Sequence, residues 1–519
     1  MHQLTRFIRD NFSAAGSDLI YFDPIDWNPQ PKFLNSIKDV KLKKFGVELN
    51  SKWKSLMRKF DRSTLCIGCV STAFDLEFPF IIPGGRFRES YYWDTFWIIE
   101  GLLASEMYDS AKGMIKNFLR MVELFGFVPN GSRLYYLNRS QPPLLVLMVN
   151  SYFEKTKDLV FLIEALPYLD QEYRFWMRER SVKIVAKSDN LEYLLNLYTP
   201  VSDSPRPESY SEDLFDASSF PSEDEKIRFY SDIVAGAESG WDFSSRWFSD
   251  PQKLTTIYTS KIVPVDLNAF MYKTEKLLAN FHRLTGNAAM ESQYSEAVEK
   301  RIRAINTILW DSKDLVWRDF SLISQEFTSN SFYISSLFPL FFGIIPAGTS
   351  DAELLAVHSP YLLKYSAGIP VSEIRNGQQW DFPNVWAPYH HTVVSYLKDF
   401  DRTLALEIAQ KFVNSVHRGW VNTGHIFEKY NAEKVGVPGG GGEYVVQEGF
   451  GWTNGVVISF LEWFGDELVI IDNSNVMIDD VALSTIIIFL TLLMAGILLM
   501  WKISQKNEKY EKFELLFTQ

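Results

Sequence analysis

Cysteine is nearly absent from this chain of 519 residues, which has only Cys66 and Cys69, in the stretch LCIGC. Two thiols cannot build a disulfide framework, so we expect a fold that does not depend on disulfides. A single CxxC motif without a second pair or nearby histidines is a weak indication of zinc. A redox pair is an alternative, but two half-buried thiols are the favoured interpretation.

Positive charge is scarce relative to negative charge. The chain has 52 Lys and Arg residues against 64 Asp and Glu residues, which gives a net charge of −12. A protein that binds nucleic acid needs a basic face to neutralise phosphates, so we expect no nucleic-acid partner. The hydrophobic share of 46% and the charged share of 22% are ordinary for a globular protein and exclude wholesale disorder.

Several catalytic motifs are missing. There is no HExxH motif, and the adjacent His390 and His391 cannot easily face one ion, so we expect no metal and no cofactor. The segment GGGGEY, which begins at Gly439, lacks the Lys-Ser or Lys-Thr of a phosphate-binding loop. No GxSxG motif supports a serine hydrolase.

Long hydrophobic runs are absent except near the C-terminus. Residues 481–501 (VALSTIIIFLTLLMAGILLMW) are 21 residues without a charge. That length spans about 30 Å of hydrocarbon as a helix, so it predicts a transmembrane segment. A buried core helix is the alternative, but such helices usually carry a polar face. The flanking charges are Asp472, Asp479, Asp480, Lys502, Lys506, Lys509 and Lys512. Acidic residues before the run and lysines after it predict a cytoplasmic tail and an extracellular body at the plasma membrane.

The N-terminal stretch MHQLTRFIRDNFSAAGSDL lacks the apolar region of a signal peptide. Taken literally, a lone C-terminal span would make a tail-anchored protein with a cytosolic body. We expect instead that Met1 is an internal start and that the native transcript encodes a leader before it.

Helical spacing of apolar residues dominates the rest of the chain, and alternating strand patterns are few. A long amphipathic helix is expected from Asp94, as its N-cap, to about Met121. Further helices are expected over residues 265–286 and after Gly286, and residues 53–60 (WKSLMRKF) also have helical spacing. These patterns predict an α-helical domain over residues 1–465, a linker over 466–480, a transmembrane helix over 481–501 and a tail over 502–519.

Four loop segments combine carboxylates, arginines and tryptophans. They are PGGRFRESYYWD (83–94), NGSRLYYLNRSQPP (130–143), RPES (206–209) with ESGWDFSSRW (238–247), and QQWDFPNVWAPYHH (378–391) with FEKY (427–430) and GGGGEYVVQEGFGWTNG (439–455). Each alone could be ordinary buried structure or a turn. Together they are typical of a pocket for a neutral polyol, because Arg and carboxylate groups bind hydroxyls while aromatic rings pack on sugar C–H faces. Cutting a glycosidic bond needs two carboxyl groups, and spacing alone leaves many candidates.

A family resemblance narrows these candidates. PGGRFRESYYWD and QQWDFPNVWAP resemble the two signature segments of the trehalases, which split α,α-trehalose into two glucose molecules. GGGGEY followed by GFGWTNG is similar to the glycine-rich segment of that family. The resemblance extends to about Phe464 and implies an all-α fold, the (α/α)6 barrel, with the single transmembrane helix added after it. It also implies inversion at the anomeric carbon.

The resemblance assigns roles to individual residues. It places the general acid at Asp242 in ESGWDFSSRW and the general base at Glu428 in FEKY. Because Asp242 must start protonated, we expect an apolar or carboxylate neighbour to raise its pKa. Glu443 has a competing interpretation, since a sugar-binding carboxylate and a catalytic base look alike in sequence. The implied substrate-binding positions are Arg86, Trp93, Asp94, Asn130, Arg139, Ser140, Gln141, Arg206, Glu208, the backbone at Gly240, and Glu443.

The predicted function is inverting hydrolysis of trehalose by a membrane-anchored enzyme, with trehalose and the lipid bilayer as partners. One alternative is an inverting hydrolase or phosphorylase on the same barrel that acts on another glucoside. Another is a non-catalytic, membrane-tethered sugar-binding protein. The presence of both Asp242 and Glu428 argues against the latter, because a binding module needs neither an acid nor a base.

Overall fold

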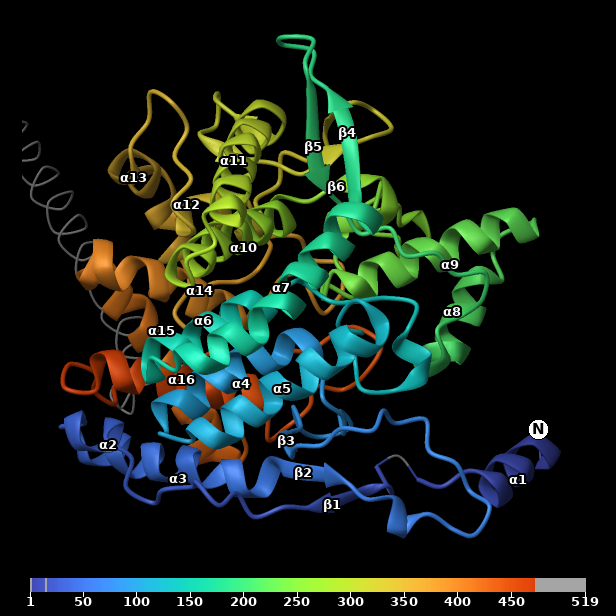
Figure 1. The fold of residues 1–519 in the computed structure, drawn as a ribbon, viewed down its shortest axis with the longest axis vertical. Helices are drawn as coiled ribbons and strands as arrows, with labels where there is room; N and C mark the ends of the chain where they lie inside the picture. Colours follow the sequence, from blue (N-terminus) through green and yellow to red (C-terminus); the bar gives the residue numbers. More distant parts are fainter. Residues whose placement is uncertain (1, 15, 472–519) are drawn as a thin grey trace, which may run out of the picture. The chain divides into compact units, whose positions relative to one another are not determined.

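Helices dominate the chain in the computed structural model, which describes residues 2–14 and 16–471 (Figure 1). The helices of this part are α1 (His2–Asn11), α2 (Phe33–Ser36), α3 (Val40–Leu56), α4 (Tyr92–Ala104), α5 (Tyr108–Phe125), α6 (Leu145–Thr156), α7 (Leu159–Glu179), α8 (Tyr210–Ala217), α9 (Glu223–Glu238), α10 (Val265–Leu284), α11 (Ala288–Ala304), α12 (Phe338–Phe341), α13 (Asp351–Leu362), α14 (Ala387–Phe400), α15 (Arg402–Thr423) and α16 (Gly451–Phe464). The helical prediction is therefore confirmed for most of the chain.

Short strands accompany the helices, so the all-α prediction is incomplete. They are β1 (Leu19–Tyr21), β2 (Met57–Phe60), β3 (Phe80–Ile81), β4 (Ser181–Val185), β5 (Glu192–Asn196), β6 (Ile262–Val263), β7 (Trp310–Asp311), β8 (Val316–Trp317), β9 (Phe320–Ser321), β10 (Glu326–Phe327), β11 (Asn384–Trp386) and β12 (Lys429–Asn431). They pair in the orders β1-β2-β3, β10-β9-β6, β11-β12, β4-β5 and β7-β8. Nine of these twelve strands have only two or three residues, too few to show an alternating pattern in the sequence.

Six helices contact one another in a closed ring. α4 contacts α6, α6 contacts α10, α10 contacts α12, α12 contacts α14, α14 contacts α16, and α16 contacts α4. In α4, every residue except Glu100 is buried, and in α16 every residue except Glu462 and Trp463. Helices α5, α7, α11 and α15 pack against this ring and bury one face each, as amphipathic helices do. The ring and its loops form the scaffold on which the site is built.

Two glycines allow α4 and α16 to meet backbone to backbone. A Cβ atom at Gly101 would collide with the backbone of Gly455, and one at Gly455 would collide with the carbonyl of Trp97. Any other residue at either position would push the two helices apart. The close approach joins the first and last helices of the ring.

The single helix predicted from Asp94 to Met121 is wrong in two respects. The stretch folds as α4 and α5, separated at Glu106, which has a φ of 62°. Asp94 does not cap the helix, because the N-cap is Tyr91 and Asp94 lies in the first turn. Its carboxyl group is used in the cavity described below.

The prediction for residues 53–60 is half wrong, because α3 ends at Leu56 and the next four residues form β2 between β1 and β3. The two remaining helices are confirmed. α10 covers most of residues 265–286 and is followed by Gly286 with a φ of 77°, and α11 follows it directly. A left-handed glycine is a common helix stop.

The interpretation of the cysteines as half-buried thiols is also wrong. Cys66 and Cys69 form a disulfide, and both residues are exposed to solvent. The bridge spans a separation of three residues in a surface loop, so it joins no two elements of the ring.

The predicted transmembrane segment, residues 481–501, lies outside the described residues, as does the tail. Among the helices of residues 2–14 and 16–471, none combines the length and apolar character needed to cross a bilayer.

Candidate active site

One cavity gathers nearly all of the predicted site residues. It is lined from the first turns of α4 and α16, the last turn of α9 and the loops beside them. Its volume is about 100 Å³. The lining residues are Arg86, Phe87, Tyr91, Trp93, Asp94, Asn130, Tyr136, Arg139, Gln141, Arg206, Glu208, Ser209, Ala237, Gly240, Asp242, Trp380, Trp386, Glu428, Glu443, Tyr444, Phe450 and Trp452. Every position named from the sequence is present except Ser140.

Asp242 lies in the loop that follows α9. In that loop Gly240 has a φ of 77°, and a Cβ atom there would lie 2.6 Å from the ring of Trp93. Only glycine fits both the backbone conformation and the space. The loop therefore lies directly against Trp93, which places Asp242 on the wall of the cavity.

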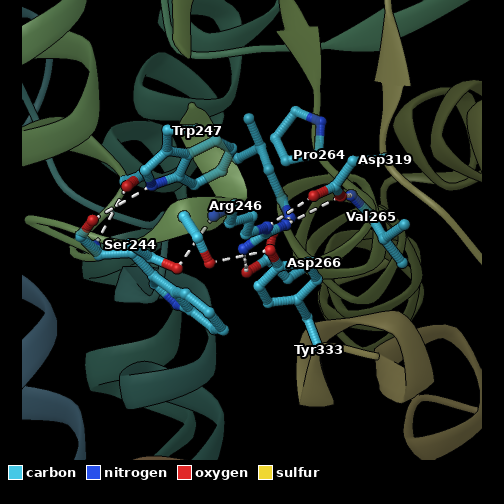
Figure 2. Close-up of polar contacts among 12 residues, drawn as sticks. Ser244, Arg246, Trp247, Pro264, Val265, Asp266, Asp319 and Tyr333 are labelled. Atoms are coloured by element: carbon cyan, nitrogen blue, oxygen red, sulfur yellow. Dashed lines mark hydrogen bonds and ion pairs between the residues drawn. The ribbon is translucent and has the colours of Figure 1, made fainter. Parts of the chain in front are cut away.

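A buried ion cluster anchors the loop beyond Asp242 (Figure 2). Arg246 donates two hydrogen bonds to Asp266, both at 2.7 Å, and two to Asp319, at 2.6 and 3.0 Å. Asp319 also accepts the backbone N–H of Val265 at 2.8 Å. Because Val265 and Asp266 open α10, the cluster ties the Asp242 loop to a ring helix.

Burial raises the pKa of Asp242 to about 7. The guanidinium of Arg206 opposes the rise, and the carboxylate of Glu443 adds to it. This agrees with the expectation that apolar surroundings and a carboxylate neighbour raise the pKa of this group. A carboxyl group with a pKa near neutrality can donate a proton at physiological pH.

Glu428 reaches the cavity from the start of β12. This strand pairs with β11, with Trp386 opposite Lys429. The N–H of Glu428 donates to the carbonyl of Gln447 at 2.9 Å, which connects it to the glycine-rich segment. The residue is 2% exposed. Two neighbouring segments therefore hold this carboxyl group at the cavity wall.

Hydrogen bonds partly offset the burial of Glu428. Burial raises its pKa, while the charge of Lys429, the hydroxyl of Tyr444, the backbone of Gln447 and the charge of Arg86 lower it. The Tyr444 hydroxyl donates to Oε1 at 2.7 Å, and the Gln447 N–H donates to Oε2 at 3.4 Å. These donors favour the ionised form that a general base requires.

Arginine–carboxylate pairs form the wall near Asp242. Nη2 of Arg206 donates to Asp213 at 2.6 Å and to Glu443 at 2.8 Å, and Arg139 pairs with Glu208. Burial raises the pKa of Glu208, but the charges of Arg139 and Arg206 outweigh it and leave the pKa below its usual value. Within the described residues, Nη1 of Arg139 and Oε2 of Glu208 lack a hydrogen-bond partner. Both atoms are buried at the cavity wall.

The loop after α5 contributes amide and charged groups. Oδ1 of Asn130 accepts a hydrogen bond from Nε of Arg139 at 2.9 Å. Oε1 of Gln141 accepts the N–H of Trp93 at 3.0 Å and so satisfies a free donor at the start of α4. Arg86 also lines the cavity but is exposed to solvent.

Ser140 does not line the cavity, which corrects its place in the predicted set. Its hydroxyl donates to the carbonyl of Val128 at 2.6 Å, and its N–H donates to Glu238 at 2.9 Å. Glu238 in turn pairs with Arg180. Neighbouring residues of a loop point in different directions, so Ser140 supports the loop while Arg139 and Gln141 face the cavity.

Asp94 is a third carboxyl group in the cavity. Burial raises its pKa to about 8, and the nearby carboxyl groups of Glu428 and Asp242 contribute to the rise. It is 7% exposed. At neutral pH this group is mostly uncharged, so it can donate a hydrogen bond to a hydroxyl group.

Apart from Trp93, sequence reasoning did not name the aromatic residues of the cavity. The rings of Trp380 and Trp386 are stacked, with centroids 3.8 Å apart and an interplanar angle of 1°. Trp452 packs edge-on against Trp386 at 5.6 Å, and Tyr444 bonds to Glu428. These four aromatic residues lie in the segments 378–391 and 439–455, which the sequence analysis had identified as candidate site segments. Their position in those segments was the available signal.

Within the described part of the chain, no cluster of three or more His, Cys, Asp or Glu residues could hold a metal ion. His390 is 0% exposed, and its Nε2 accepts the N–H of Ile369 at 2.8 Å. This histidine is part of the packing of α14.

Comparisons with known proteins identify a family. The family described as Trehalase matches residues 1–465. A trehalase from Dictyostelium discoideum is 44% identical over 486 residues, covering 90% of this chain and 82% of that protein. A trehalase from Homo sapiens is 43% identical over 474 residues, covering 90% of this chain and 81% of that protein. The solved structure of neutral trehalase from Saccharomyces cerevisiae has a TM-score of 0.60 at 23% identity and covers 74% of this chain and 73% of that chain, a similarity of fold alone.

Proposed function

Because the chain belongs to the trehalase family of glycoside hydrolases, we propose that its cavity binds α,α-trehalose and hydrolyses it to two glucose molecules. One observation carries the proposal: two carboxyl groups, the partly buried Asp242 and the buried Glu428, line a single cavity in different electrostatic settings. The pKa of Asp242, at about 7, suits a proton donor. The hydrogen bonds that Glu428 accepts suit a carboxylate that must be ionised to act as a base.

In the proposed reaction, Asp242 donates its proton to the glycosidic oxygen as the bond from that oxygen to the anomeric carbon breaks. Glu428 removes a proton from a water molecule whose oxygen forms the new bond on the opposite face of that carbon. The configuration at this carbon is inverted. Afterwards Glu428 releases its proton to solvent, and Asp242 takes one up.

Substrate binding is proposed for the groups that remain available around the two carboxyls. The unpartnered atoms of Arg139 and Glu208, together with Arg206 and Glu443, suit sugar hydroxyls, and the Trp380–Trp386 pair lies at the same cavity wall. The volume of about 100 Å³ is small, since sites for small molecules usually have about 300–1,000 Å³. A disaccharide therefore requires the cavity to widen.

The fold is proposed to be the (α/α)6 barrel expected from the resemblance. The closed ring of α4, α6, α10, α12, α14 and α16, with further helices packed against it, supports this assignment. The position of the cavity at the ends of α4 and α16 agrees with a site built by the loops at one end of such a barrel.

We also propose that residues 481–501 span the plasma membrane, with residues 502–519 in the cytoplasm and the catalytic domain outside. The support is the uncharged run and the flanking charges in the sequence. The test is to express the chain as given and with a heterologous leader, and to treat intact cells with an impermeant protease. With the leader, the domain should be digested and the tail protected. If the chain without the added leader is active on cytosolic trehalose, and its catalytic domain stays protected from the protease, the proposal is overturned.

Glucose release from trehalose by the purified protein tests the activity. Asp242→Asn and Glu428→Gln should each lower turnover by about 10²-fold to 10⁴-fold, while the protein still binds trehalose. Wild-type rates in either variant would overturn the assignment. Faster release from maltose than from trehalose would identify a different glucoside as the substrate.

A further inference from the structure

A second cavity lies within the helix ring, further along α4. It has a volume of about 640 Å³ and is lined by side chains from all six ring helices. Trp97 and Glu100 of α4 line it, whereas Trp93 and Asp94, one turn earlier, line the catalytic cavity. The rings of Trp93 and Trp97 meet edge to face with centroids 5.5 Å apart. This aromatic contact lies between the two cavities.

Buried polar groups on the wall of this second cavity lack partners. His391 is 4% exposed and Trp97 is 2% exposed, yet Nε2 of His391 and Nε1 of Trp97 have no hydrogen-bond partner within the described residues. Oε2 of Glu100 lies 3.8 Å from Nε2 of His391, which is too far for a hydrogen bond. The other oxygen of Glu100 accepts the hydroxyl of Ser151. Unpaired buried polar atoms are costly, so these groups call for an occupant that bonds to them.

A cation on the same wall is also unpaired. Lys273 of α10 lines the cavity, and no acidic side chain of the described residues forms an ion pair with it. Burial lowers its pKa, and the nearby charge of Lys276 lowers it further. Burial has the opposite effect on the carboxyl group of Glu100, whose pKa it raises. The other charged lining residues, Glu154, Lys155, Lys398 and Asp399, form ion pairs. Among the described residues that line the cavity, Lys273 is therefore a cation without an ion pair, and Glu100 is a carboxyl group without a cationic partner at hydrogen-bonding distance.

This combination discriminates between classes of ligand. An anion would be attracted by Lys273 but repelled by the carboxylate of Glu100. A cation would be attracted by Glu100 but repelled by Lys273. Hydroxyl groups can accept hydrogen bonds from Lys273 and from the indole of Trp97 and can donate one to Glu100, so a neutral polyol suits all three groups. The cavity also has aromatic walls, including Trp463, which lies 5.1 Å from the ring of His391. Sugar C–H faces pack on such rings.

We propose that this second cavity is a binding site for a neutral polyol of monosaccharide size, separate from the catalytic cavity. The site does not depend on the proposed reaction, because none of its polar groups lines the catalytic cavity. Hydroxyl groups of the ligand bridge Lys273, Glu100 and His391, and a ring of the ligand packs against Trp463.

The test uses the full chain labelled with 5-fluorotryptophan and observed by ¹⁹F NMR. The Trp463 resonance is assigned by its loss in Trp463→Phe, and that of Trp386, in the catalytic cavity, by its loss in Trp386→Phe. Titration with glucose should shift the Trp463 resonance with its own midpoint. His391→Phe should abolish that shift, and Glu100→Gln, which keeps the side-chain volume, should raise the midpoint at least tenfold.

The matched control is Tyr396→Phe, which removes a hydroxyl from a residue on the same wall. That hydroxyl donates to Asp351 at 2.9 Å, so its loss should leave the midpoint unchanged. If glucose leaves Trp463 unaffected, or shifts it equally in wild type and Glu100→Gln, the proposal is overturned. A Trp463 shift with inorganic phosphate but not with glucose would show an anion site instead. The Trp386 resonance reports on the catalytic cavity separately. Failure of the proposed catalytic function can therefore be distinguished from failure of the second binding site.

Discussion

The hydroxyl of Tyr444, in the glycine-rich segment, donates a 2.7 Å hydrogen bond to Oε1 of Glu428, at the start of β12. Burial alone raises the pKa of Glu428, and this bond is one of the interactions that oppose the rise. The charged form of a carboxyl group gains more from a donated hydrogen bond than the neutral form does. Tyr444 therefore favours an ionised base in a place where water is largely excluded.

Tyr444→Phe should narrow the pH profile of trehalose hydrolysis. A hydrogen bond to a charged group contributes about 1.5–3 kcal/mol, which corresponds to roughly one to two pH units. Loss of the bond raises the pKa of Glu428, so the acidic limb of kcat/KM should move to higher pH and the maximum should fall. Tyr361→Phe, whose hydroxyl donates to the carbonyl of Pro370, is the control and should leave the limb in place. An unchanged acidic limb in Tyr444→Phe would contradict the role.

Glu443→Gln should shift the alkaline limb in the opposite direction. The pKa of Asp242 is about 7, so activity should fall as this proton donor ionises above that pH. The negative charge of Glu443 favours the protonated form, and its removal therefore lowers the pKa and moves the alkaline limb of kcat/KM to lower pH. KM should rise as well, because Glu443 pairs with Arg206 on the substrate wall. A limb that stays in place or moves upward is inconsistent with this coupling.

The stereochemistry of the products tests the proposed inversion. Attack on one α-linked glucose unit should release that unit as β-glucose, while the leaving unit keeps the α configuration. Proton NMR at early times should then show equal amounts of the two anomers, before mutarotation mixes them. Release of α-glucose alone would mean retention, and Glu428 would then act as a nucleophile.

Arg246→Met should destabilise the fold far more than the loss of an exposed ion pair. The side chain of Arg246 is 1% exposed, and its removal leaves Asp266 and Asp319 buried without their cation. Breaking a buried pair in this way costs about 3–5 kcal/mol in the free energy of unfolding. The control is Arg402→Met, whose side chain is 51% exposed; surface pairs contribute at most about 1 kcal/mol. Urea denaturation measures both, and equal losses would contradict the anchoring role.

The segments that form the cavity could be predicted from their unusual composition, whereas the roles of individual residues came from the family resemblance. Asp242, Glu428 and Arg206 each lie in a stretch rich in charged and aromatic residues, and the structure brings these stretches to one cavity. The orientation of individual side chains could not be predicted in the same way. Ser140 lies between Arg139 and Gln141 in one motif, yet its hydroxyl bonds to Val128 and leaves the cavity.

Local rules were misleading where tertiary contacts override them. Asp94 precedes an apolar run, which is typical of an N-cap, but its carboxyl group lies in the cavity beside those of Asp242 and Glu428. The helix that contains Asp94, α4, ends at Ala104, and no proline or glycine marks the break between α4 and α5. Strands β11 and β12 pair segments far apart in sequence, with Trp386 opposite Lys429, so their pairing could not be inferred from one segment.

The direct contact between Gly101 and Gly455 has a consequence for biosynthesis. α4 has its most extensive helix–helix contact with α16, which the ribosome makes roughly 20 to 70 s later at typical rates of about 5–20 residues per second. Until then the almost wholly apolar surface of α4 has no partner on that side. We expect a nascent chain that stops before Gly455 to leave this surface open and to bind chaperones, because the last helix of the ring covers the first.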